Sequence, residues 1–137
     1  MAKNILQQII GRYLDRDAQV LQTLHELKQL AQNMKEDLDH RRIDAFGEKI
    51  SRVWECNKQL DAGSTTPEID AILQRVQPNI LGAKLLGAGG GGFLFMVSKD
   101  KKAGEQIRRI LCEDPPNERA RFFDFAIDSG GIRTTVL

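Results

Sequence analysis

The stretch from Lys84 to Val97 constrains the fold of this chain more than any other, because two short apolar runs flank a loop that carries almost no side chains. The loop consists of Gly87, Ala88, Gly89, Gly90, Gly91 and Gly92. Short apolar runs bounded by glycine are typical of β-strands. Glycine loses more conformational entropy on folding than other residues do, and consecutive glycine N–H groups can form a nest for an anion. The pattern predicts two strands joined by bare main chain that approaches something else closely.

Length and charge exclude several classes of protein. The 137 residues predict a single domain spanning 1–137, large enough to fold without disulfides or a structural metal. Lysine and arginine number 20 against 19 aspartate and glutamate residues, which gives no basic surface for nucleic acid or an anionic membrane. No apolar run approaches the roughly 20 residues that span a bilayer, and the first residues lack the apolar core and cleavage site typical of a signal peptide. We therefore expect a cytoplasmic protein.

Cysteine and histidine give no sign of a metal site. Cys56 and Cys112 lack CxxC spacing and read as free thiols, and His25 and His40 lie in charged helical patterns. The sequence predicts no metal ligand and no catalytic residue.

Apolar periodicity predicts the order of the elements. Helices are expected at about 5–14, 18–40, 44–60 and 67–76, and another after the capping sequence that ends at Asp100. Strands are expected at 83–86, 93–97, 121–128 and 132–136. The strand at 93–97 is apolar on both faces, so it is expected to be central and covered on both sides. The predicted fold class is α+β, a helical layer packed on a four-stranded, mainly antiparallel sheet.

The glycine loop fits none of the common nucleotide-binding motifs fully. Gly87, Gly89 and Gly92 match GxGxxG, but a strand follows where a dinucleotide-binding motif requires a helix. No Gly-Lys-Ser/Thr follows for a Walker A loop, and the other signatures of protein kinases are missing. From the residues alone, two interpretations remain open: a loop that lies close to phosphate, and a tight hairpin with its glycines packed under a helix.

The run from Lys84 to Phe93 closely resembles the third signature motif of the GHMP kinases, which lies on a strand–loop–strand in their C-terminal domain. Residues 2–6 and 24–28 resemble the sugar-kinase branch that acts on L-fucose or heptose 7-phosphate. The stretches 57–63, 96–100, 107–111 and 116–122 favour L-fucose. The resemblance covers essentially the whole chain and implies a ferredoxin-like C-terminal domain.

The resemblance also implies a missing half, because members of this family carry an N-terminal domain with a glycine–serine phosphate loop and, usually, a catalytic aspartate. Neither occurs here, so the chain is expected to be inactive alone and to pair with its own N-terminal kinase domain. That domain would bind most of the ATP and Mg²⁺ and share the small sugar substrate. The resemblance assigns Gly87 to Gly92 to the ATP-phosphate cleft, and Ala88 and the loop N–H groups to the contact. The alternatives are a heptose 7-phosphate kinase domain and a stand-alone binding or regulatory module, and a homodimer is expected if the partner domain is absent.

Overall fold

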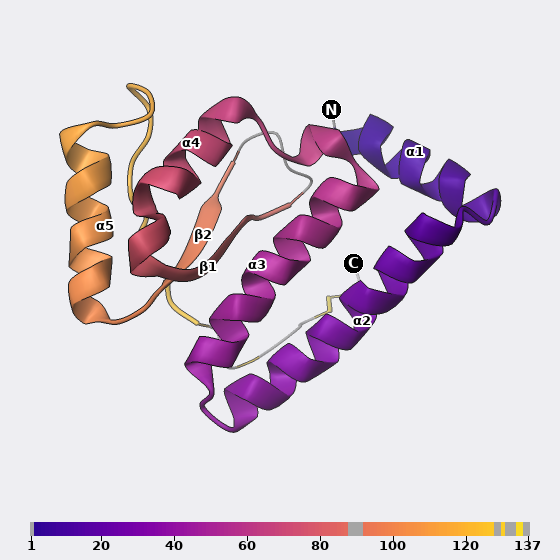
Figure 1. The fold of residues 1–137 in the computed structure, drawn as a ribbon, viewed down its shortest axis with the longest axis horizontal. Coiled ribbons are helices and arrows are strands. Elements are labelled where there is room, and N and C mark those ends of the chain that lie inside the picture. The colour runs from indigo at the N-terminus through magenta and orange to yellow at the C-terminus, as the bar shows by residue number, and fades with distance from the viewer. Residues whose placement is uncertain (1, 88–91, 128–129, 131–133, 136–137) are drawn as a thin grey trace.

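A computed structural model describes residues 2–87, 92–127, 130 and 134–135, and these residues form five α-helices and one β-hairpin (Figure 1). The order along the chain is α1 (Ala2–Leu14), α2 (Ala18–Asp39), α3 (Ile43–Leu60), α4 (Pro67–Val76), β1 (Ile80–Leu85), β2 (Leu94–Ser98) and α5 (Lys101–Glu113). Short 3-10 turns at Ala62–Ser64 and Gln77–Asn79 precede α4 and β1. The helices and the first two strands lie close to their predicted positions.

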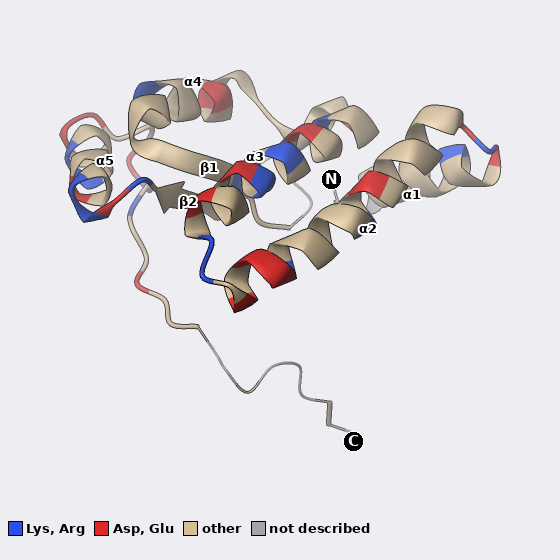
Figure 2. Ribbon diagram, turned by 60° about the horizontal axis from the view of Figure 1, so that its bottom comes forward, with Lys and Arg blue, Asp and Glu red and all other residues tan. Residues whose placement is uncertain are grey.

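The helices α2 and α3 form a hairpin that opens like a V in Figure 1. Asp17 caps α2 by accepting a hydrogen bond from the Val20 amide at 3.1 Å. At the closed end of the V, the buried carboxylate of Asp37 accepts hydrogen bonds from Arg42 Nε at 3.0 Å and Lys49 Nζ at 2.6 Å. Figure 2 shows acidic residues at the end of α2 beside the basic turn that leads into α3. The ion pairs of Asp37 with Arg42 and Lys49 therefore stabilise the turn between the two helices.

The starts of α4 and α5 follow from capping sequences that are visible in the chain. Thr66 Oγ1 accepts from the Ile69 amide at 3.4 Å, and Pro67 occupies the first turn, where a missing N–H costs nothing. The Asp100 carboxylate accepts from the Ala103 amide at 2.7 Å. Both helix starts are confirmed as predicted.

The sheet is the antiparallel hairpin β1–β2, in which Lys84 pairs with Phe95 and Leu85 with Leu94. One face of the hairpin packs into the core, where Leu85 meets Trp54 of α3 and Ile69 of α4. Along the edge of β1 that faces away from β2, the Ala83 amide donates to Ser51 Oγ of α3 at 3.3 Å. Helix α3 therefore covers this edge of the sheet as well as contributing to the core.

The predicted four-stranded sheet is wrong, because only two strands form within the described residues. Residues 121–127 alternate as expected but form no strand, and most of the predicted strand at 132–136 lies outside the described residues. Alternation of apolar residues decides which side chains share a face, but it does not supply a hydrogen-bonding partner for the backbone.

The expectation that the second strand is central and covered on both faces is also wrong. Every residue of β2 is only partly buried, and the strand lies at one side of a two-stranded sheet. A run of apolar residues identifies a strand that is stabilised when other elements bury its faces. Whether that cover is present depends on the elements that pack against it.

Candidate functional site

Both ends of the glycine loop are built from glycines in left-handed conformations. The hairpin closes where the Leu86 amide donates to the Phe93 carbonyl at 2.8 Å. Immediately inside that bond lie Gly87, with φ of 86°, and Gly92, with φ of 104°. Residues with a Cβ adopt such φ values at a cost, so the chain enters and leaves the loop through conformations that favour glycine.

These two glycines are exposed rather than packed. A Cβ added to Gly87 would meet nothing within 4 Å, and one added to Gly92 would reach only the Leu86 carbonyl oxygen, at 4.0 Å. The interpretation of glycines packed beneath a helix is therefore wrong for these two positions. The other site residues predicted from the sequence, Ala88, Gly89, Gly90 and Gly91, lie outside the described residues.

The hairpin face opposite the core carries Lys84 and Leu86 from β1 and its extension, and Phe93 and Phe95 from the β2 side. We call these four residues the open face. Strand alternation places them together, since Lys84 pairs with Phe95 and Leu86 bonds to Phe93. Leu86 is 47% exposed and Phe93 is 56% exposed. The open face therefore presents large apolar side chains directly beside the glycine loop.

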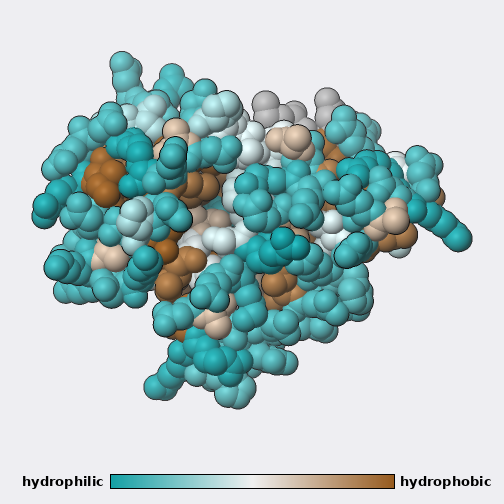
Figure 3. Space-filling view, in the orientation of Figure 1, coloured by the Kyte–Doolittle hydropathy of each residue, from teal (hydrophilic) through white to brown (hydrophobic). Residues whose placement is uncertain are grey.

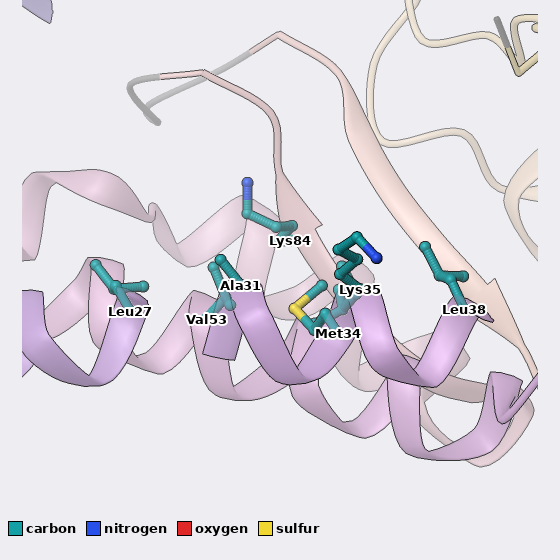
Figure 4. Close-up of a pocket in the computed structure, with 8 residues that line it drawn as sticks. Leu27, Ala31, Met34, Lys35, Leu38, Val53 and Lys84 are labelled. Carbon is teal, nitrogen blue, oxygen red and sulfur yellow. The ribbon is translucent and has the colours of Figure 1, made fainter. Parts of the chain in front are cut away.

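A shallow groove of about 480 Å³ adjoins the open face at Lys84. Figure 4 shows side chains of α2 along one side of the groove and Lys84 reaching in from β1. It is lined by Leu27, Ala31, Met34, Lys35, Leu38, Ile50, Val53 and Lys84, none of which carries a carboxylate. Lys84 Nζ donates to the Leu85 carbonyl at 2.9 Å, and burial lowers the pKa of this amine. The groove is thus apolar with a partly desolvated cation at its end.

Apolar side chains reach the surface at several places between hydrophilic ones (Figure 3). The large exposed ones are Leu6, Ile10, Tyr13, Leu14, Leu21, Leu38, Ile43, Leu86, Phe93, Phe122, Phe123, Phe125 and Ile127. The last five are Phe93, which follows the glycine loop, and four residues of the C-terminal segment, of which Phe123 lies against Phe93.

Metal and membrane features are not seen in the part of the chain that is described. No three His, Cys, Asp or Glu side chains among those residues gather in a way that could hold a metal ion. No described helix is both long and apolar enough to cross a bilayer. The cysteines are free, with Cys56 buried and Cys112 exposed.

A strand–glycine loop–strand beneath a layer of helices is the arrangement expected for one class of kinase domain. A family model described as the C terminal of GHMP kinases matches residues 34–117, more than half of the chain. The chain belongs to the GHMP kinase C-terminal family.

Two relatives are similar over most of the chain. The L-fucokinase/L-fucose-1-P guanylyltransferase of Bacteroides fragilis is 39% identical over 134 residues, which is 98% of this chain. The bifunctional fucokinase/GDP-fucose pyrophosphorylase of Arabidopsis thaliana is 32% identical over 113 residues, or 82% of this chain. The match spans only 14% and 11% of these relatives' own lengths. The resemblance predicted from the sequence is therefore confirmed: the chain belongs to the GHMP kinase C-terminal family and is similar to proteins named as fucokinases.

Two features of the site were not predicted from the sequence. Lys84 is the one charged residue within β1, and its position in an otherwise apolar strand was a signal for the groove. The second feature is an edge-to-face contact of the Phe123 ring with the Phe93 ring, with centroids 5.0 Å apart. Its signal in the sequence was weaker, the alternation of Phe123, Phe125 and Ile127. That alternation placed these side chains on one side but did not indicate what they contact.

Proposed function

We propose that this chain is the C-terminal domain of an ATP-dependent sugar kinase that phosphorylates L-fucose at its anomeric hydroxyl. The observation that carries the proposal is the hairpin closed by Leu86 and Phe93, with exposed left-handed glycines at both ends of its loop, in a member of the GHMP kinase family. The names of the two relatives support L-fucose as the substrate. Heptose 7-phosphate is the alternative sugar.

The glycine loop is proposed to lie against the phosphates of Mg-ATP. Open space around Gly87 fits this role, because a polyanion held nearby could approach the backbone N–H groups without meeting side chains. In such a reaction a bond forms between the anomeric oxygen and the γ-phosphorus, the bond to the β,γ-bridging oxygen breaks, and the hydroxyl proton passes to a base outside this chain. Catalysis of this kind depends on positioning and on charge stabilisation. The loop's contribution is to shape the cleft with main chain alone.

The partner is proposed to be an N-terminal kinase domain that docks on the open face. Leu86 and Phe93 offer exposed apolar area beside the loop, and Lys84 offers a cation without a carboxylate in the adjoining groove. A docking surface with apolar residues around one carboxylate would complement this pattern. When that domain is absent, the same face favours association of two copies.

The first experiment tests the division of labour. The chain alone, mixed with Mg-ATP and L-fucose, is expected to give no sugar phosphate, and a polypeptide that includes the N-terminal domain is expected to give fucose 1-phosphate. Turnover by the 137 residues alone would contradict the proposed division. Absence of turnover from the longer polypeptide with both L-fucose and heptose 7-phosphate would favour a stand-alone binding module.

The second experiment tests the loop. Gly87→Ala and Gly92→Ala, made in the longer polypeptide, are expected to raise the KM for ATP at least several-fold, since each forces a Cβ into a left-handed conformation beside the phosphates. Gly11→Ala is the matched control, because its Cβ also meets nothing within 4 Å but lies in α1. Equal kinetics for all three variants would contradict the role of the loop.

A further inference from the structure

The C-terminal segment, residues 121–127, makes regular ring contacts with the β2 side of the hairpin. The Phe123 ring lies edge-to-face on Phe93, with centroids 5.0 Å apart and planes at 74°. The Phe125 ring lies in the same way on Phe95, with centroids 6.2 Å apart. Both pairs advance by two residues in the same direction, so the segment follows the hairpin in a fixed register rather than touching it at one point.

The opposite side of the segment contacts α5. The guanidinium of Arg108 lies 4.7 Å from the centroid of the Phe122 ring, and its Nη2 is 3.8 Å from a carboxylate oxygen of Asp124. The side chains of Phe123 and Phe125 therefore face the hairpin, while those of Phe122 and Asp124 face the helix. These contacts on two sides orient the side chains of the segment, although the segment forms no strand.

Phe93 is the residue through which these contacts reach the glycine loop. It directly follows Gly92, and its carbonyl accepts the Leu86 amide in the hydrogen bond that closes the hairpin. Phe93 is 56% exposed even with Phe123 against it, and the ring pair is the aromatic contact that holds its side chain. Loss of the Phe123 ring would leave the Phe93 side chain largely in solvent.

We propose that Phe123 is a positioning residue that holds the Phe93 end of the hairpin, and thereby the exit of the glycine loop, in place. An edge-to-face pair is worth a factor of about 3 to 10 in an equilibrium between held and released states. We call this contact of the Phe123 ring with the Phe93 ring the clamp. Its effect on the affinity for ATP rests on the proposed function, whereas its effect on the hairpin does not. Phe123 acts through Phe93 and is not proposed to contact ATP or the sugar.

Amide hydrogen exchange of the 137-residue chain tests the clamp directly. In Phe123→Ala, the Leu86 amide is expected to exchange about 3- to 10-fold faster, because the bond to the Phe93 carbonyl opens more often. The Lys99 amide, which donates to Asn79 at 3.0 Å beyond the far end of the same hairpin, is expected to keep its rate. Fluorescence of Trp54, the single tryptophan, reports that the core remains folded.

Two further variants separate ring contact from general disturbance of the segment. Phe123→Tyr keeps the ring and is expected to restore the wild-type rate at Leu86. Ile127→Ala removes an apolar side chain that is 89% exposed and is expected to leave that rate unchanged. The clamp is overturned if Phe123→Ala leaves Leu86 exchange unchanged, if it accelerates Leu86 and Lys99 equally, or if Ile127→Ala has the same effect.

Kinetics in the longer polypeptide then address the link to ATP. If both proposals hold, Phe123→Ala raises the KM for ATP more than it lowers kcat, and Phe123→Tyr restores it. Faster exchange at Leu86 with unchanged kinetics would support the clamp and overturn the role of the loop in binding phosphate. The exchange result therefore decides the clamp even when the wild-type polypeptide shows no kinase activity.

Discussion

Gly82 of β1 lies directly against the main-chain carbonyl of Gly47 in α3, so close that a Cβ on Gly82 would fall 1.8 Å from the carbonyl oxygen. A Cβ on Gly47 would in turn fall 2.5 Å from the Cβ of Leu81. Helix and strand thus meet backbone to backbone, which brings Ser51 close enough to bind the Ala83 amide. This contact sets the distance between α3 and the hairpin that carries the glycine loop.

Gly82→Ala is expected to lower the free energy of unfolding by about 3 kcal/mol, at the upper end of the range for overpacking, because the clash is with main chain and no rotamer change can relieve it. Urea unfolding followed by Trp54 fluorescence measures the loss. Gly11→Ala is the control, since a Cβ there meets nothing within 4 Å and alanine favours a helix by about 0.5–1 kcal/mol. Equal stabilities for the two variants would show that the backbone contact is not tight.

Asp37→Asn is expected to destabilise the protein in a manner that depends on pH. The hydrogen bond from Lys49 and then that from Arg42 lower the pKa of Asp37 below 3.8, although burial of the carboxyl group opposes them. A carboxyl group whose pKa is lowered by folding stabilises the folded state above its unfolded pKa, and this contribution is lost as the pH falls through its folded pKa. The wild-type Tm is therefore expected to exceed that of the variant at neutral pH and to converge on it as the pH falls below 3.8 and through the folded pKa of Asp37.

Asp39→Asn provides the control for this prediction. Asp39 pairs with Lys35 one turn away on the solvent side of α2, where both side chains are more than half exposed. Exposed pairs of this kind contribute little to stability. If Asp39→Asn lowered the Tm as much as Asp37→Asn, the result would argue against a special role of Asp37 in stabilising the turn between α2 and α3.

Trp54→Ala is expected to cost about 3–5 kcal/mol, because this side chain is buried between Ile69 and Leu85 at the centre of the core. Trp54→Phe is expected to cost less, since it keeps an aromatic ring and removes an indole N–H that has no partner within the described residues. Circular dichroism must follow unfolding, because both variants remove the single tryptophan. Leu14→Ala, at an exposed position, serves as the control and is expected to be neutral.

Lys84→Met is expected to stabilise the isolated chain at pH 7. Burial lowers the pKa of Lys84, so the charged amine opposes folding, and the wild type is expected to gain stability as the pH rises toward 10.5. The difference in stability between variant and wild type is therefore expected to narrow as the pH rises toward 10.5. Lys102→Met, at an exposed position of α5, is the control and is expected to change the free energy of unfolding little when both variants are measured in urea.

The helices were predictable because their signals are local. Asp17, Thr66 and Asp100 each cap a helix by bonding an amide three residues ahead. The hairpin was predictable for the same reason, because Gly87 and Gly92 supply the positive φ angles that the chain adopts at the two ends of the loop. The exposed setting of Gly87 and Gly92 could not be predicted, because it depends on which helices pass nearby.

The sequence by itself determined the positions of the helices and of the hairpin, since capping, apolar periodicity and the glycine loop act over a few neighbouring residues. Only the tertiary structure decided that residues 121–127 contact Phe93 and Phe95 through their rings without joining the sheet. It also decided that Lys84 lies at the end of an apolar groove. These outcomes depend on contacts between residues far apart in the chain, and a local pattern specifies which side of an element is apolar but not what will cover it.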